Sequence, residues 1–262
     1  MNISVTSPSN SRLKVSRQLD SRSGIVRNGL FLMEGPRFIS DLLVSREPEW
    51  VILSTDARGA SRETAARVSG MGCDVLEVPP GLFADISDTD TSQGILAVFP
   101  LPEPDSVSIP GTGLILLLDG VSDPGNTGTL IRSAAAFGCS GVVTGRGCCF
   151  PYIPKVTRAA AGLNARIPIL FDAVLPSFMR RLRPRTEFIG ADPAGDEAAV
   201  LNRRRESLGL VIGSEARGIS TEVAELLDRR VAIPMAPGVE SLNAAVSGSI
   251  LLYEACRSRR TD

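Results

Sequence analysis

The chain has 262 residues, 43% of them hydrophobic, and a formal net charge of −1. This length fits one large or two ordinary domains, and the composition is typical of a globular α/β protein and excludes a largely disordered chain. The complete lack of histidine excludes histidine-based catalytic triads, a histidine general base and histidine-containing metal sites.

Cysteine usage and hydropathy predict a soluble, cytoplasmic protein. The five cysteines are odd in number and include no C-x-x-C pair, a pattern typical of reduced thiols. No apolar run reaches the length of a membrane span, and the first residues, MNISVTSPSNSRLK, are too polar for a secretory signal. We therefore expect no membrane contact and no metal centre.

Residues 1–100 are predicted to form a small α/β domain. Helical patterns cover residues 8–23, 36–45, about 63–68 and 80–87, and strand patterns cover residues 30–35, 49–55, 73–78 and 94–100. Ser9 or Asn10 is suited to open the first helix, and Pro36 stands at the first position of the second. Residues 1–30 carry five basic residues against one acidic residue, which favours a nucleic-acid contact there.

A proline-rich segment separates this domain from the rest of the chain. Residues 100–113, PLPEPDSVSIPGTG, contain four prolines, so we predict a linker at residues 101–112 and a second domain at 113–262. In that domain, strand patterns cover residues 113–120, 140–145, 167–170, 186–192, 207–213 and 230–235, and helical patterns cover residues 127–137, 153–162, 175–182, 220–229 and about 243–258. Such alternation predicts a mostly parallel sheet with helices on both faces.

The turn DPGNTG after the first of these strands is not a known phosphate loop. Its glycine spacing differs from the G-x-G-x-x-G dinucleotide fingerprint. A P-loop requires a lysine where this chain has Asn126, which disfavours a nucleotide-hydrolysing α/β protein. Asn126 is also suited to cap a helix that starts at residue 127, so a purely structural role is open.

Two more strands end in turns with polar residues. Glu215 follows the strand at 207–213, and Ser241 and Asn243 precede the last helix. Each of these residues has a structural alternative, because acids before helices and capping serines and asparagines are common. Parallel strands place their carboxyl ends at one edge of a sheet, where open α/β sheets bind ligands. We therefore expect the three turns to meet in one site.

At these turns the chain resembles the SpoU/TrmH family of SPOUT RNA ribose 2′-O-methyltransferases. The motif N-x-G-x-x-x-R corresponds to Asn126, Gly128 and Arg132, and a second motif to Gly213, Ser214 and Glu215. A third corresponds to Ile233, Met235, Ser241, Leu242 and Asn243. FLMEGPRFI and TSQGILAVFP resemble the family's substrate-binding domain. Ala216 departs from the glycine that the family usually has after the glutamate.

The resemblance implies a C-terminal SPOUT domain with a trefoil knot, a homodimer with active sites at the subunit interface, and S-adenosylmethionine as methyl donor. It implies 2′-O-methylation of structured RNA, with ribosomal (23S) RNA favoured because of the N-terminal domain. The alternatives are a tRNA 2′-O-methyltransferase and a non-catalytic RNA-binding or ribosome-assembly protein of the same fold. The intact motifs argue against the non-catalytic alternative.

The resemblance also assigns roles to single residues. Arg132 is the catalytic arginine, either as a base helped by an RNA phosphate or as an electrostatic stabiliser; a merely solvated arginine early in a helix would oppose the macrodipole. The expected catalytic partners are Asn126, Glu215, Ser241 and Asn243. The expected cofactor contacts are Gly213, Ile233, Met235 and Leu242. The expected RNA contacts are Arg12, Lys14, Arg17 and Arg37.

Overall fold

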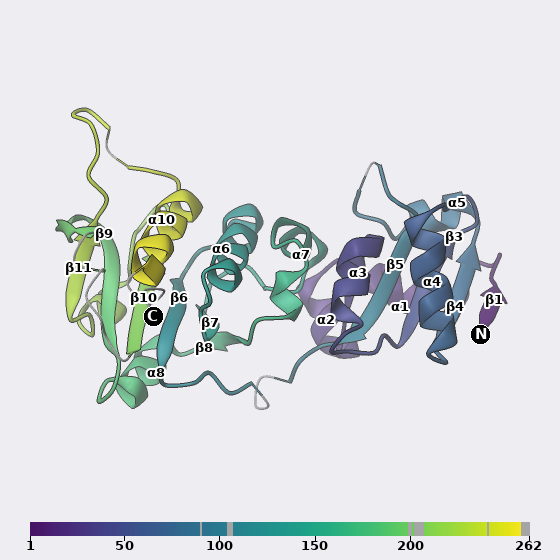
Figure 1. Ribbon diagram of the computed structural model, residues 1–262, viewed down its shortest axis with the longest axis horizontal. Coiled ribbons are helices and arrows are strands. Elements are labelled where there is room, and N and C mark those ends of the chain that lie inside the picture. Colours follow the sequence, from purple (N-terminus) through teal and green to yellow (C-terminus); the bar gives the residue numbers. More distant parts are fainter. Residues whose placement is uncertain (90, 104–106, 199–200, 202–206, 240, 258–262) are drawn as a thin grey trace. The chain divides into compact units, whose positions relative to one another are not determined.

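A computed structural model of the chain describes residues 1–89, 91–103, 107–198, 201, 207–239 and 241–257. The chain divides into two compact units, Met1–Glu103 with Tyr152–Ala165, and Pro104–Pro151 with Arg166–Asp262 (Figure 1). Residues 104–106 of the predicted linker and residue 258 of the predicted last helix lie outside the described residues. Among the described residues, no helix combines the length and apolarity that crossing a membrane requires.

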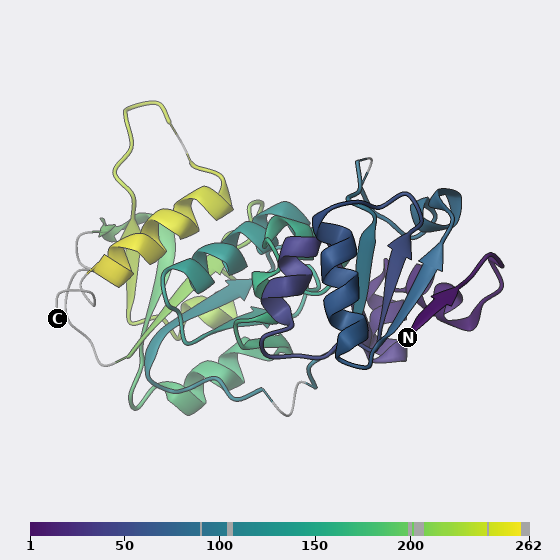
Figure 2. The same cartoon turned by 45° about the vertical axis from the view of Figure 1, so that its right-hand side comes forward.

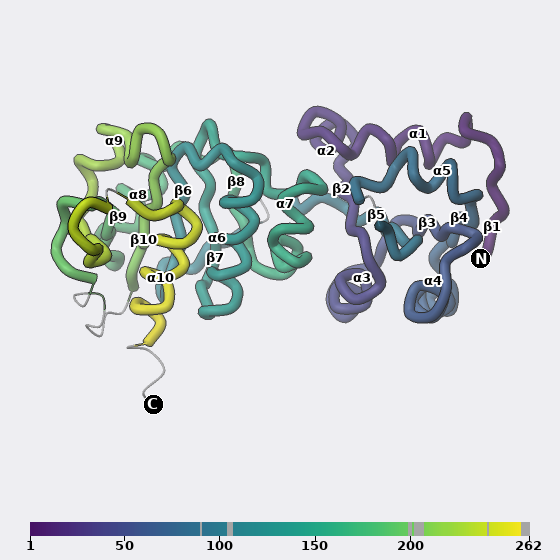
Figure 3. Tube along the Cα trace, turned by 90° about the horizontal axis from the view of Figure 1, so that it is seen from above, coloured from purple at the N-terminus to yellow at the C-terminus, as the bar shows by residue number. Residues whose placement is uncertain are grey.

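The N-terminal unit is a five-stranded sheet covered by helices on both faces. The strands have the order β1-β4-β3-β5-β2, with β1 at Asn2–Ser4, β2 at Leu30–Glu34, β3 at Trp50–Ser54, β4 at Asp74–Val78 and β5 at Ile95–Pro100. Figure 3 shows α1 (Ser11–Gln18), α2 (Arg22–Asn28) and α5 (Pro80–Ala84) on one face, and α3 (Pro36–Leu42) and α4 (Ala60–Gly70) on the other. The strand β1, which we did not predict, pairs with β4.

Local capping divides the first predicted helix in two. Asn10 caps α1, because its side chain accepts hydrogen bonds from the N–H groups of the first turn. The side chain of Ser21 then accepts from the N–H of Gly24 and opens α2. The prediction of one helix over residues 8–23 is therefore wrong in its length, because a second capping residue lies inside that range.

Residues 152–165 belong to the N-terminal unit, although their sequence pattern places them in the C-terminal domain. They form α7 (Pro154–Ala159) and a 3₁₀ turn (Leu163–Ala165). Tyr152 is buried, and its ring centre lies 5.2 Å from that of Phe31 on β2. Burial of these aromatic rings is the physical reason why the segment packs with the first sheet.

The C-terminal unit is built on a six-stranded sheet in which every pair is parallel. The order is β11-β9-β10-β6-β7-β8, with β6 at Gly113–Asp119, β7 at Gly141–Gly145, β8 at Ile169–Ala173, β9 at Glu187–Glu197, β10 at Ser207–Gly213 and β11 at Arg229–Ala232. Residues Leu114 to Leu118 of β6 are all buried, as expected for a central strand covered on both faces. The predicted mixed α/β fold with a parallel sheet is confirmed; the trefoil knot stays a prediction.

Helices α6 (Pro124–Ala136) and α10 (Ala244–Arg257) lie side by side on one face of this sheet (Figures 1 and 2). The other face is covered by α8 (Leu175–Leu182) and α9 (Thr221–Ala224). Gly248 permits the close approach of α10, because a Cβ there would lie only 2.4 Å from the Leu130 side chain of α6. The two helices that begin with the predicted site residues are thus packed directly against each other.

The sheet has its switch point between β6 and β10. These strands are neighbours in register, with Asp119 opposite Gly213 at their carboxyl ends. The chain continues from β6 to β7 and β8 on one side, whereas β9 and β11 lie on the other side of β10. Loops that leave such a point in opposite directions open a crevice between them. This places the loop before Asn126 beside the loop that carries Glu215.

Candidate active site

Asn126 is in the first turn of α6, but it does not cap the helix. The helix begins at Pro124, a residue whose fixed φ suits the first position. Asp123 is the cap, and its carboxylate accepts a hydrogen bond of 2.7 Å from the backbone N–H of Asn126. The predicted start at residue 127 is therefore wrong. Because the Asp123 carboxylate accepts the hydrogen bond from this free N–H group at the helix end, the Asn126 side chain is available for other contacts.

Glu215 lies at the exposed tip of a tight turn after β10. Ser214 and Gly218 exchange two backbone hydrogen bonds of 2.8 and 3.0 Å, which close the turn. The left-handed residue of this turn is Gly218, with φ of 66°, and not Ala216. Alanine in place of the family's usual glycine is therefore compatible with this backbone.

A chain of side-chain hydrogen bonds joins the three turns. The Asn126 amide nitrogen donates to a carboxylate oxygen of Glu215, and the Asn243 amide nitrogen donates to Asn126 Oδ1 at 3.0 Å. Asn243 Oδ1 in turn accepts from the backbone N–H groups of Ala245 and Val246 and caps α10. A carboxylate only accepts and a backbone N–H only donates, so both amides have a single allowed orientation. The expected meeting of the three turns is thus present in the structure.

A cavity of about 470 Å³ lies beside these turns. Glu215, Ser241 and Asn243 line it, together with all four predicted cofactor contacts, which are Gly213, Ile233, Met235 and Leu242. Further apolar walls come from Ile212, Val231 and Leu251. The volume is typical of a small-molecule site, where apolar walls and a few polar groups converge. The residues fit a partly apolar cofactor such as S-adenosylmethionine.

Gly213, which lines this cavity, lies very close to the backbone of the turn that follows β10. A Cβ at this position would lie 2.2 Å from the backbone carbon of Gly218 and 2.4 Å from the nitrogen of Ile219. The close approach of two backbone segments therefore needs glycine.

We expect Gly213→Ala to lower the free energy of unfolding by about 1–3 kcal/mol, because the added methyl group forces the two segments apart. Denaturant unfolding measures this change. The control is Gly70→Ala, because its Cβ would meet no atom within 4 Å. Equal stability of Gly213→Ala and wild type would contradict the close approach.

Arg132 lies apart from the hydrogen-bonded chain. It is exposed, forms no ion pair or hydrogen bond with another described residue, and does not line the cavity. It stands in the second half of the 13-residue helix α6. The argument that an arginine here opposes the macrodipole is therefore wrong, because that effect is confined to the first turn. What the structure shows is a guanidinium that pairs with no described residue and lies on the face that α6 presents to solvent.

Several residues of the site escaped the sequence patterns. Asp119 accepts a hydrogen bond of 2.7 Å from the backbone N–H of Ser220 and holds the Glu215 turn against β6. Asp192 on β9 lines the cavity and forms an ion pair with Arg230 at 2.7 Å. The signal for Asp119 was present, since it stands at the carboxyl end of the parallel strand β6. Asp192 lies in the middle of β9, where the strand pattern gives no such signal.

Cys148 Sγ lies 3.1 Å from the carbonyl oxygen of Leu118 on β6. Burial raises the pKa of Cys148 to about 11, so the group is a neutral thiol near pH 7 and no nucleophilic thiolate. In the part of the chain that the structure describes, no group of three or more acidic or sulfur side chains is arranged to hold a metal ion.

The predicted RNA contacts differ in their availability. Arg12 forms a 2.8 Å ion pair with Asp74 and lies over the Trp50 ring. Arg17 binds the carbonyl of Pro8 at 2.9 Å and pairs with Asp85 at 3.4 Å. By contrast, Lys14 and Arg37 are exposed, and neither forms an ion pair with any described residue. The two unpaired cations are the stronger candidates for phosphate contacts.

Comparison with known proteins places both units in families. Residues 113–253 match the SpoU rRNA Methylase family, and residues 10–97 match the MRM3-like substrate binding domain. The 23S rRNA (guanosine(2553)-2′-O)-methyltransferase RlmP of Bacillus subtilis is 30% identical, and the match covers 95% of this chain and 97% of that protein.

Solved structures agree with this assignment. The SpoU methyltransferase AviRb of Streptomyces viridochromogenes in complex with AdoMet has a TM-score of 0.85 and 26% identity, over 96% of this chain and 99% of that chain. An AdoMet-bound rRNA methyltransferase from Sinorhizobium meliloti has a TM-score of 0.84 and 26% identity, over 98% of both chains. With more than half of its residues matched by the family profile and three of its motif residues, Asn126, Glu215 and Asn243, joined in one site, the chain belongs to the SpoU rRNA Methylase family of RNA methyltransferases.

Proposed function

We propose that this protein methylates the 2′-hydroxyl of one ribose in ribosomal RNA, with S-adenosylmethionine as methyl donor. The observation that carries the proposal is the hydrogen-bonded chain of Glu215, Asn126 and Asn243 beside a cavity lined by Gly213 and Leu242. Relatives support the RNA class, because the Bacillus subtilis protein is named for 2′-O-methylation of 23S rRNA. Since ribosomal RNA is the proposed substrate, the cytoplasm is the proposed place of action.

The cavity residues would hold the cofactor in two ways. The side chains of Ile233, Met235 and Leu242 would bury its apolar surface, and the backbone at Gly213 would approach it closely. When bound, the cofactor supplies a methyl group on a positively charged sulfur. The chain's own residues must therefore orient the ribose hydroxyl and stabilise the oxygen as its proton leaves.

Arg132 is the proposed catalytic residue. Its guanidinium stays protonated in proteins, so we favour a role as an electrostatic stabiliser over a role as a base. The planar fork would hold an RNA phosphate and lower the energy of the developing alkoxide. Asn126 and Asn243 would position the nucleotide, because Glu215 fixes the direction of their amides. Ser241 would add a hydroxyl at the same edge of the cavity.

We further propose a homodimer in which a second copy covers the exposed side of α10. Apolar side chains spaced four and three residues apart are exposed there, namely Val246, Ile250 and Tyr253. This spacing puts them on one side of a helix, and an exposed apolar stripe is typical of an interface. The dimer would bring Arg132 of one copy to the site of the other.

We expect Val246→Glu to convert the dimer into monomers, because it buries a charge in the proposed interface. Light scattering of the purified protein measures the mass. The matched control is Val174→Glu, since Val174 is 46% exposed against 48% for Val246 but belongs to the other face of the sheet. A dimeric Val246→Glu variant would contradict the proposed interface.

We propose that residues 1–100 form the RNA-binding domain and that residues 113–262 form the domain that transfers the methyl group. Residues 101–112 would connect these two domains. We expect Lys14→Ala with Arg37→Ala to weaken binding of all RNA sequences alike. The slope of log affinity against log salt should fall by about 0.7–0.9 per phosphate contact. The control is Arg67→Ala on α4, and an unchanged slope in the double variant would exclude these contacts.

Methyl transfer from labelled S-adenosylmethionine to total RNA of cells that lack the gene tests the proposed function. We expect label in ribosomal RNA, released by nuclease digestion as a 2′-O-methylnucleoside. Label in transfer RNA alone would favour the tRNA alternative. Binding of the cofactor without transfer to any RNA would favour a non-catalytic RNA-binding protein.

A further inference from the structure

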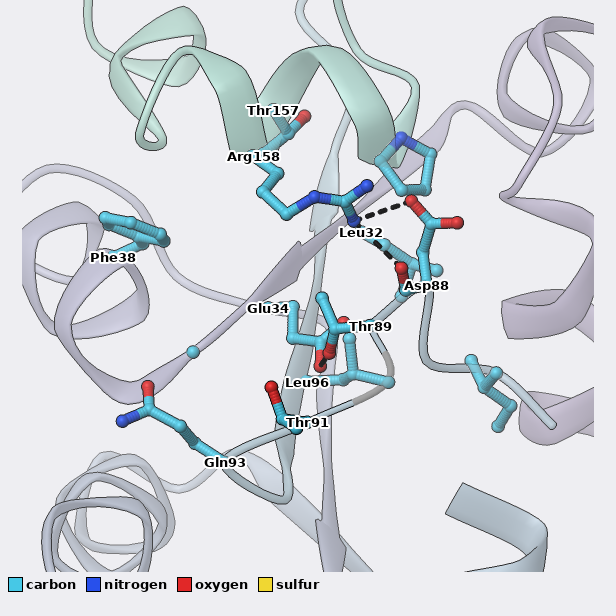
Figure 4. A pocket seen from close by; sticks show the side chains of 13 residues that line it. Leu32, Glu34, Phe38, Asp88, Thr89, Thr91, Gln93, Leu96, Thr157 and Arg158 are labelled. Atoms are coloured by element: carbon cyan, nitrogen blue, oxygen red, sulfur yellow. Dashed lines mark hydrogen bonds and ion pairs between the residues drawn. The ribbon is translucent and has the colours of Figure 1, made fainter. Parts of the chain in front are cut away.

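The N-terminal unit contains a second cavity, distinct from the cofactor site. Its volume is about 160 Å³, more than ten times the space of about 10–15 Å³ that one water needs. It lies among β2, the start of α3, residues 86–89 and 91–93, and α7, all within one unit (Figure 4). Leu32, Ile86 and Leu96 give it apolar walls. This volume is below the roughly 300–1,000 Å³ of typical ligand pockets, so the cavity has room for a small group only.

Glu34 lines this cavity, and one of its two carboxylate oxygens takes all of its hydrogen bonds from described residues. Three hydroxyl groups donate to its Oε1 atom, at 2.8 Å from Ser87, 2.7 Å from Thr89 and 2.6 Å from Ser92. No described residue donates a hydrogen bond to the other oxygen, Oε2. A carboxylate can accept on both oxygens, so Oε2 is free to accept from a ligand. The three hydroxyls fix the carboxylate in place.

An aromatic ring and an amide stand around the same space. Figure 4 shows Phe38, Gln93 and Glu34 around the cavity. Gly35 keeps the gap between them open, because a Cβ there would lie 3.5 Å from Gln93 Oε1 and 3.8 Å from the Phe38 ring. Its φ of 100° also favours glycine. The cavity therefore combines a surface for stacking with groups that read hydrogen bonds.

One basic residue lines the cavity, and two more are close to lining residues in the sequence. Arg158 lines the cavity and is held by the carboxylate and the carbonyl oxygen of Asp88 at 2.7 and 3.0 Å. Lys155 lies between the lining residues Pro154 and Thr157 on α7, and is exposed. Arg37 lies between the lining residues Gly35 and Phe38, and is also exposed. Cations beside an aromatic cavity suit a nucleotide, whose base enters while its phosphate stays at the rim.

We propose that this cavity takes one unstacked base of the RNA substrate, and that Glu34 selects a base with an amino group. The proposal rests on the proposed function, because that function makes RNA the ligand. An amino group donates to Glu34 Oε2 in the way that cytosine N4 donates to a glutamate. Uracil presents the acceptor O4 at the same position, so two acceptors would face each other. The cavity is then a specificity determinant outside the catalytic unit.

The test compares short oligo(C) and oligo(U) RNA, which differ at the position that Glu34 reads. We expect the wild type to bind oligo(C) about tenfold more tightly than oligo(U), as measured by fluorescence anisotropy. In Glu34→Gln the amide oxygen can still accept from the three hydroxyl groups, and the amide nitrogen takes the place of Oε2. This changes the atom that faces the base from an acceptor to a donor. This variant should lose the preference for oligo(C) or reverse it. Glu63→Gln, an exposed glutamate on α4, is the matched control and should keep the preference.

Equal binding of the two RNAs by the wild type, or an unchanged preference in Glu34→Gln, would overturn the proposal. Unfolding curves of Glu34→Gln and of the control Glu63→Gln show whether Glu34→Gln is folded. Gln93→Ala is a second variant in the cavity, and it leaves the hydrogen bonds of the three hydroxyl groups to Glu34 intact. Methyl transfer to ribosomal RNA is measured in parallel. Methyl transfer to ribosomal RNA without a preference for oligo(C) would contradict only the proposed base selection by this cavity. A preference for oligo(C) without methyl transfer to any RNA would contradict only the proposed function.

Discussion

Replacement of Arg132 by alanine is expected to lower kcat for RNA methylation by about 10²–10³-fold. This is the usual cost of removing one preorganised group that stabilises developing negative charge. The affinity for RNA should change far less, because many phosphate contacts share the binding energy. Single-turnover methylation and anisotropy binding separate the two effects. Arg132 has no partner among the described residues, so its loss should leave the free energy of unfolding unchanged.

The comparison with Arg132→Lys decides what the guanidinium contributes. Lysine keeps the charge but lacks the planar fork that holds two oxygens at once, so we expect it to restore only part of kcat. Arg180→Ala, an exposed arginine on α8, is the control for loss of a positive charge. Full activity of Arg132→Lys would remove the special role of the guanidinium, and full activity of Arg132→Ala would remove Arg132 from catalysis.

Asn126→Asp is expected to lower kcat by about 10²-fold, because it places a carboxylate against that of Glu215 and removes the donor that joins them. The substitution preserves size, so the effect reports on hydrogen-bond direction. Steady-state methylation gives kcat, and calorimetry gives the affinity for S-adenosylmethionine. Asn126 is half-buried and Glu215 exposed, so we expect a smaller effect on the free energy of unfolding than on kcat.

A double variant makes this prediction specific. Combining Asn126→Asp with Glu215→Gln restores a donor opposite an acceptor, and the Asn243 amide can still donate to position 126. We expect the double variant to be more active than Asn126→Asp alone, with a coupling free energy of about 0.5–3 kcal/mol. If the effects of the two substitutions on the activation free energy, RT ln kcat, simply add, the hydrogen-bonded chain has no part in positioning.

The parallel sheet and the order of its elements could be predicted because periodicity is a local property. The bounds of α8 and β10 agree with their sequence patterns, since buried strands and amphipathic helices have distinct apolar spacing. The convergence of Asn126, Glu215 and Asn243 could be anticipated from strand ends alone. Parallel strands leave few alternatives for where their carboxyl ends lie.

Other features depend on contacts between distant residues. The helix predicted over residues 220–229 ends at Ala224. Asp228 is instead drawn to β9, where its carboxylate accepts from the N–H of Phe188 at 2.8 Å and pairs with Arg183 at 3.2 Å. Such tertiary contacts override helical periodicity and leave no local signal. For the same reason, the pairing of Arg12 and Arg17 with acidic residues could not be read from the chain.

A ribose-methylation map of all cellular RNA, with and without the gene, tests the central claim most directly. We predict that one 2′-O-methyl mark in large-subunit ribosomal RNA disappears when the gene is absent. The wild-type gene should restore the mark, and a gene carrying Arg132→Ala should not. A map that is identical in both strains, or the loss of a base methylation in place of a ribose methylation, would contradict the account.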